Sequence, residues 1–144
     1  MVERDKPFLL IGSPPCTVFS KLFQTHVSPM DPVVLRKRIR EGLIHLKISI
    51  ELYRMQIAGG RYFLHEHPWG AWSWRVPEVQ ALNNRVGVEC VKGHMWAQGM
   101  YIEDPDGRAL AFKPTGWLSN SVHILEQLGK PCTNLSDNPK HYHR

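Results

Sequence analysis

One long amphipathic segment does most to limit how this chain can fold. Apolar residues recur at steps of three and four from Leu35 to Ile57, the spacing of one continuous helical face. Asp31-Pro32 supplies an N-cap acid and a proline at the first helical position, and Gly59-Gly60 predicts the end of the helix. The opposite face carries basic residues, which we interpret as a solvated surface: Arg36, Lys37, Arg40, Lys47 and Arg54.

Short apolar runs on both sides of this segment predict β-strands. The run Phe8–Ile11 stops at Gly12, and Tyr62–Leu64 follows the glycines that end the helix. Two buried strands joined by a helix form a right-handed βαβ unit with parallel strands. The predicted fold class is therefore α/β.

The C-terminal half predicts smaller elements. The turn sequence at 104–107, Asp-Pro-Asp-Gly, separates two strand-like runs at 95–102 and 109–112, which predicts an antiparallel hairpin. A short helix is expected at 76–84 and a further strand at 87–91. Ser119 is expected to cap a last helix that reaches Leu128.

Composition limits the class of protein. The 144 residues predict a single domain over 1–144, and 42% hydrophobic with 22% charged residues excludes disorder. A net charge of +5 suits a polyanionic partner. Three cysteines without disulfide spacing, and no signal-peptide stretch after Met1, predict an intracellular protein of the cytoplasm, nucleoid or nucleus. No apolar run approaches the roughly 20 residues of a membrane span.

The residues most suited to chemistry follow the two predicted strands. Cys16 lies on a loop stiffened by Pro14 and Pro15, just after the first strand, and Glu66 follows the second. The carboxyl ends of parallel strands share one edge of a sheet, where open α/β folds place their sites. A free cysteine is as often buried and inert, but the pairing with Glu66 favours a reactive thiol.

These residues carry a family resemblance. Gly12-Ser13-Pro14-Pro15-Cys16 resembles the Pro-Cys nucleophile motif of the cytosine-C5 DNA methyltransferases, and the segment 63–68, Phe-Leu-His-Glu-His-Pro, resembles their Glu motif. The segment 113–116, Lys-Pro-Thr-Gly, with the following Asn120, is similar to phage-type or mobile-element relatives. The resemblance covers roughly residues 8–120. It implies a partial Rossmann-like methyltransferase sheet, a βαβ unit plus a C-terminal antiparallel hairpin.

The resemblance also implies a reaction and its partners. Cys16 would add to C6 of a pyrimidine in DNA, and Glu66 would bind the edge of the base. S-adenosylmethionine would be the methyl donor. The substrate-binding residues it suggests are Pro15, Ser20, His67 and Lys113. Further candidates are Trp69, Trp72 and Trp74 for base stacking, although core packing is the commoner role, and Lys21, Arg75 and Lys113 for phosphate contacts.

The sequence departs from the family at several points. Thr17 stands where the family has Gln after the cysteine, His67 replaces Asn, and Gln98 lacks the arginines of a Gln-x-Arg-x-Arg motif. Only fifteen residues precede Cys16, so the Gly-rich cofactor loop is not visible, nor is a target-recognition region. Three explanations stay open: one subunit of a split enzyme with a cofactor-binding partner, a relict domain, or cofactor-free use of the Cys/Glu pair. The alternative function is a non-catalytic nucleic-acid-binding or assembly module on the same fold.

Metal binding is a separate hypothesis. The candidate ligands of a zinc site that would join the tail to the hairpin are Cys90, His94, Cys132, His141 and His143. Their spacing matches no short zinc motif. His65 and His67 lie on one side of the second strand with Glu66 on the other, where hydrogen-bonded histidines are the commoner outcome. A zinc deaminase is excluded because His65-Glu66 lacks the spacer and no Pro-Cys-x-x-Cys follows.

Overall fold

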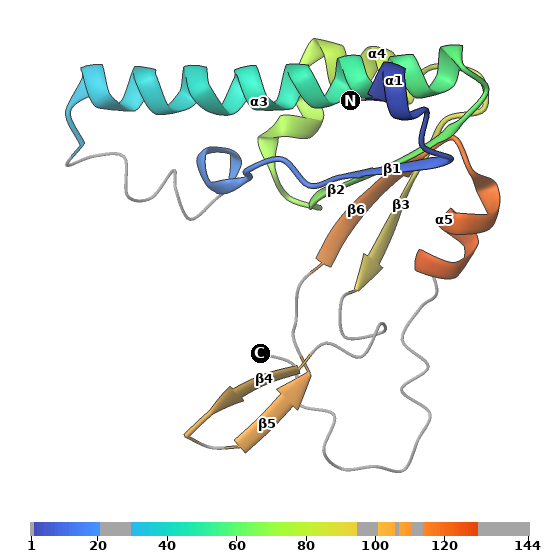
Figure 1. Ribbon diagram of the computed structural model, residues 1–144. Coiled ribbons are helices and arrows are strands. Elements are labelled where there is room, and N and C mark those ends of the chain that lie inside the picture. The colour runs from blue at the N-terminus through green and yellow to red at the C-terminus, as the bar shows by residue number, and fades with distance from the viewer. Residues whose placement is uncertain (1, 21–29, 95–100, 106, 111–113, 130–144) are drawn as a thin grey trace.

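The sheet of this protein has four strands and mixed direction. The computed structural model describes residues 2–20, 30–94, 101–105, 107–110 and 114–129. The strand order is β1-β2-β6-β3, with β1 and β2 parallel and β6 antiparallel to both of its neighbours (Figure 1). The strand bounds are β1 Leu9–Gly12, β2 Tyr62–Pro68, β3 Glu89–His94 and β6 Pro114–Ser119.

The predicted strand-helix-strand unit is confirmed. Helix α3 spans Pro32–Ala58, and the Asp31 carboxylate accepts a hydrogen bond from the backbone N–H of Val33 at 2.7 Å, as an N-cap should. Gly59 is the C-cap. The two strands are direct parallel neighbours, with Leu9 opposite Tyr62. The chain is therefore α/β with a mixed sheet.

The C-terminal half required a correction. The predicted hairpin forms as β4 (Tyr101–Asp104) and β5 (Gly107–Leu110), but these strands make a two-stranded sheet of their own. In the main sheet β6 pairs antiparallel with both β2 and β3, and no strand was predicted over 114–119. Pro114 opens the strand, where a missing N–H is tolerated. A Cβ on Gly116 would lie 2.4 Å from the Trp74 ring, so this glycine admits the indole.

The last helix is also capped differently from the expectation. Ser119 ends β6, and its hydroxyl donates to the backbone carbonyl of Phe63 at 2.5 Å. Ser121 is the N-cap of α5 (Val122–Leu128), because its hydroxyl accepts from the N–H of Ile124. The predicted helix therefore starts two residues later, because a strand takes up the residues before it.

Helices cover the two faces of the sheet unequally. Helix α3 and the short helix α4 (Pro77–Asn83) lie on one face, and α5 packs against β3 and β6 (Figure 1). The core lies under α3, and its fully buried large side chains include Phe19, Leu46, Ile50, Tyr53, Phe63, Leu82 and Leu118. The remaining short elements are α1 (Val2–Asp5) and the 3-10 turns η1 (Thr17–Phe19) and η2 (Trp72–Arg75). Within the described ranges, no helix is long and apolar enough to cross a bilayer.

Candidate functional site

Two hydrogen bonds join the loop after β1 to the end of β2. The Ser13 hydroxyl donates to a carboxyl oxygen of Glu66 at 2.5 Å. Nε2 of His67 lies 2.9 Å from the backbone oxygen of Pro14. Because Ser13 and Pro14 stand just before Cys16, these bonds hold the cysteine loop at the carboxyl end of β2, beside Glu66.

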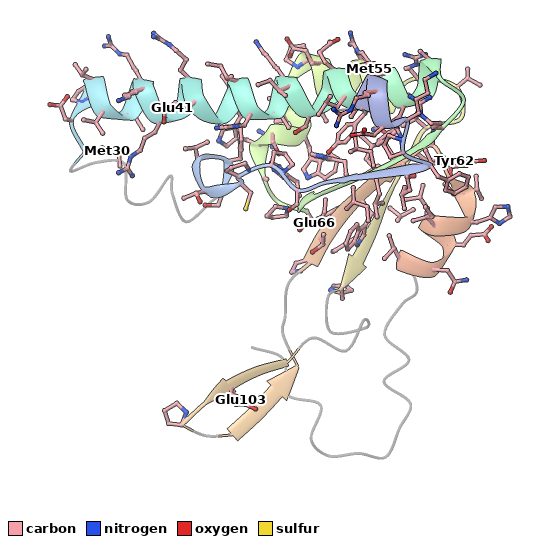
Figure 2. The ribbon with its side chains drawn as sticks, in the orientation of Figure 1. Met30, Glu41, Met55, Tyr62, Glu66 and Glu103 are labelled. Carbon is pink, nitrogen blue, oxygen red and sulfur yellow. The ribbon has the colours of Figure 1, made fainter. Side chains whose placement is uncertain are left out.

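Glu66 lies on the face of the sheet that points away from α3. Side chains alternate along a strand, and the neighbouring His65 and His67 are buried against the core. Glu66 itself is only half-buried, opposite Trp117 of β6. Figure 2 shows it near the end of β2, below the long helix. The Ser13 hydroxyl orients Oε2 of the carboxylate, and Oε1 is buried.

Cys16 precedes a turn that is firmly anchored. The thiol is half-buried, between the exposed Pro15 and Thr17, and the Cys16 backbone oxygen accepts from the N–H of Phe19 at 3.0 Å. Phe19 is fully buried, and its ring lies 4.6 Å from that of Trp72. The anchoring fixes the backbone beside Cys16, a residue that is itself half-buried.

Side chains of η1 and η2 complete this anchoring. The Trp72 indole N–H donates to the backbone oxygen of Val18 at 2.9 Å, and the Trp74 indole N–H donates to that of Pro68 at 2.8 Å. The half-buried Ser20 donates to the backbone oxygen of Thr17 at 2.9 Å. Trp72 and Trp74 therefore support the site from within, whereas Trp69 is 44% exposed and Nζ of Lys92 lies 5.8 Å from the centre of its ring.

His67 acts on the cysteine loop from inside the core. A carbonyl can only accept, so the proton sits on Nε2 and is donated to Pro14, while Nδ1 accepts from the Ser73 hydroxyl at 2.6 Å. Burial lowers the pKa of His67, which keeps the ring neutral. Both ring nitrogens are thus engaged by protein groups. In this geometry His67 positions the loop, and direct contact with a substrate stays a prediction.

His65 forms a second buried pair beside it. Its Nδ1 lies 2.8 Å from the Tyr53 hydroxyl, and the two histidine rings are 5.0 Å apart. Burial, with a smaller contribution from His67, lowers the pKa of His65 to about 3. The expectation that these histidines are hydrogen-bonded residues at a strand end is confirmed.

We expect the two buried histidines to make the protein sensitive to acid. The unfolded chain binds a proton at each histidine near pH 6.5, whereas the folded chain does not bind one at His65 until about pH 3. Since the unfolded state binds more protons, the free energy of unfolding falls below pH 6.5 by up to about 1.4 kcal/mol per pH unit per histidine. Urea unfolding at several values between pH 7 and pH 5 measures this slope.

A matched pair of variants isolates the effect. His65→Asn keeps a polar group near Tyr53 but removes one titrating ring, so the slope should decrease by up to about 1.4 kcal/mol per pH unit. His123→Asn makes the same replacement at an exposed histidine of α5 and is the control for the substitution itself. An equal slope in wild type and His65→Asn would contradict the prediction.

The other predicted site residues either lie on β3, away from Cys16 and Glu66, or fall outside the residues that the structure describes. Lys21, Lys113, Cys132, His141 and His143 are outside the described residues. Cys90 is half-buried, and burial raises its pKa to about 11. Four residue steps along β3 put the Cα atoms of Cys90 and His94 about 13 Å apart, too far for one zinc ion. The described residues contain no group of three metal-ligating side chains. A zinc site that includes the tail stays a prediction.

Four residues that support the site were not singled out from the sequence. Ser13 orients Glu66, Ser73 orients His67, Tyr53 bonds His65, and Gly12 leaves room for the Tyr53 hydroxyl. Ser13 belongs to the Gly-Ser-Pro-Pro-Cys motif, so its position offered a signal. Tyr53 and Ser73 offered none, because their partners are distant in sequence.

No protein-family model, curated protein or solved structure matches this chain. The cofactor that the resemblance implies is S-adenosylmethionine. A Gly-rich turn at the carboxyl end of a strand is what would receive such a cofactor. At the end of β1, a Cβ on Gly12 would lie 1.9 Å from the Tyr53 hydroxyl, and the loop continues with two prolines. The described residues at this edge do not form a cradle for the cofactor.

Proposed function

We propose that this chain binds a pyrimidine base and adds the Cys16 thiolate to C6 of the ring, as a cytosine-C5 DNA methyltransferase-like protein. The supporting observation is the pair of hydrogen bonds, Ser13 to Glu66 and His67 to Pro14, that hold the cysteine loop beside Glu66. The parallel β1–β2 pair joined by α3, followed by the antiparallel pair β3–β6, is compatible with the Rossmann-like half-sheet that the resemblance implies.

The residues present suit this addition. The thiolate sulfur forms a bond to C6, and the electron pair of the C5–C6 double bond moves to C5 and into the ring. A carboxyl group at the N3 and amino edge, the role proposed for Glu66, offsets the charge that develops there. C5 then takes a proton from water, the original C5 proton leaves, and the sulfur is expelled. The net result is exchange of the C5 hydrogen with solvent.

Methyl transfer is not part of what these residues do alone. The described residues do not fit S-adenosylmethionine, so the donor would have to be held by a second protein subunit. The base must be single-stranded or flipped out of a duplex, because a stacked base cannot reach Cys16. DNA is the proposed polymer, and an intracellular compartment is proposed because a reactive thiol must stay reduced.

Loss of C5 tritium from a single-stranded oligonucleotide containing [5-³H]cytosine tests this proposal without any cofactor. We expect release by the wild-type protein, release at background in Cys16→Ser, and release reduced by about 100-fold in Glu66→Gln. Cys90→Ser, which removes a half-buried thiol on β3, is the matched control and should release tritium normally.

Wild-type release no faster than that of Cys16→Ser would contradict addition at C6. Nucleic-acid binding that is insensitive to Cys16→Ala would then favour the alternative, a non-catalytic nucleic-acid-binding or assembly module.

A further inference from the structure

The N-terminal part of α3 concentrates the positive charge of the protein. Arg36, Lys37, Arg38 and Arg40 lie within five residues, and all four side chains are exposed. Helix α3 holds six basic and two acidic residues, so it contributes +4 while the whole chain carries +5. We call these four residues the α3 basic cluster.

This arrangement costs stability within the chain. Arg36 and Arg40 are one turn apart, where like charges destabilise a helix by about 0.2–0.5 kcal/mol. The cluster also lies near the positive end of the helix dipole, and the first turn contains no acidic residue. Among the described residues no ion pair involves the cluster, whereas Lys47 pairs with Glu78 at 3.5 Å and Arg54 with Glu51 at 3.3 Å. A bound polyanion would offset this repulsion.

One residue of the cluster, Arg38, faces the cysteine loop across a pocket. Figure 1 shows the N-terminal half of α3 running past the sheet, above η1. None of residues 32–41 is buried, and within this segment Leu35 and Ile39 alone are half-buried. A pocket of about 310 Å³ separates the helix from the loop, with Pro15, Thr17 and Val18 on one wall and Arg38 and Glu41 on the other. Arg38 is the one member of the cluster that lines this pocket, and it faces Pro15 and Thr17, the two residues on either side of Cys16.

We propose that the α3 basic cluster binds the phosphate backbone of a single-stranded nucleic acid, which then follows the pocket to Cys16. The choice of a pyrimidine polymer rests on the proposed function, whereas the charge and the pocket do not. An anionic membrane is the other polyanion that a basic helix can meet. The pocket favours a nucleic acid, because its apolar wall of Pro15 and Val18 suits a base, while Glu41 beside Arg38 keeps the phosphates on the exposed cluster outside the pocket.

Two double variants with equal charge change test the surface. Arg36→Gln/Arg40→Gln removes two charges of the cluster, and Lys47→Gln/Arg54→Gln removes two charges of the same helix that already have acidic partners. Binding of a fluorescent single-stranded cytosine oligonucleotide is measured by anisotropy between 25 and 200 mM salt. We expect about tenfold weaker binding at low salt, and a salt slope reduced by about 1.4, for the first variant alone. Its midpoint of thermal unfolding should not decrease.

Several outcomes would overturn the inference: no binding by the wild-type protein at low salt, equal losses in both variants, or tighter binding to phosphatidylserine vesicles than to the oligonucleotide. Tritium release is read separately on the wild-type protein. Cluster-dependent binding without release would reject the proposed function alone, whereas release with equal binding by both double variants would reject this surface alone.

Discussion

Replacing Gln56 with methionine should destabilise the protein by about 3 kcal/mol. Gln56 is fully buried, and its amide nitrogen donates to the backbone oxygens of Pro7 and Tyr62 at 2.9 and 2.8 Å. Its amide oxygen accepts from Nε of Arg61 at 3.1 Å. Methionine has nearly the same shape but can make none of these bonds, at about 1 kcal/mol each, and it leaves two backbone acceptors without their donor.

Urea unfolding with an unchanged m-value would measure this loss. Gln80→Met, on an exposed position of α4, is the matched control and should change the free energy of unfolding by less than about 0.5 kcal/mol. If Gln56→Met unfolded at the wild-type midpoint, the buried amide would not be what fixes the C-terminal end of α3 to the starts of both parallel strands.

Gly12→Ala should lower the free energy of unfolding by a similar amount. Gly12 is the last residue of β1, directly before the cysteine loop. A Cβ at this position would lie 1.9 Å from the Tyr53 hydroxyl oxygen and 2.7 Å from Cζ of the same ring. The Tyr53 ring would have to move away from the new methyl group. Moving it disrupts its stacking on Phe63, at 4.7 Å between ring centres, and the hydrogen bond of its hydroxyl to His65. Overpacking of a core with loss of a buried hydrogen bond costs about 3 kcal/mol. Chemical denaturation gives the stability.

A double-mutant cycle tests the cause of that loss. Tyr53→Phe removes the hydroxyl that meets the new methyl group, at a cost of about 1 kcal/mol for the bond to His65. The double variant Gly12→Ala/Tyr53→Phe should therefore be less destabilised than the sum of the single variants, by about 1 kcal/mol. Strict additivity would show that the clash is elsewhere.

How far the sequence predicted the fold depended on how local each signal was. The helix over 32–58 was predicted to its last residues, because an N-cap, a proline, a periodic face and two glycines all act within the segment. Strand β6 was missed, because what makes a strand of Pro114 and Gly116 is their position between β2 and β3 and against Trp74. Local residue preferences carry no information on such partners.

For the candidate site, too, some features could be predicted from local sequence and others could not. The sequence by itself determined that a cysteine and a glutamate would lie at one edge of two parallel strands, since strand order and the βαβ connection dictate a shared edge. The strand end was predicted too early, because Glu66 lies within β2 and pairs with Trp117 of β6. Only the tertiary structure decided that Ser13 bonds Glu66 and that His67 bonds Pro14. Those contacts join residues 53 apart in the chain, and they depend on burial and hydrogen-bond geometry that no local pattern encodes.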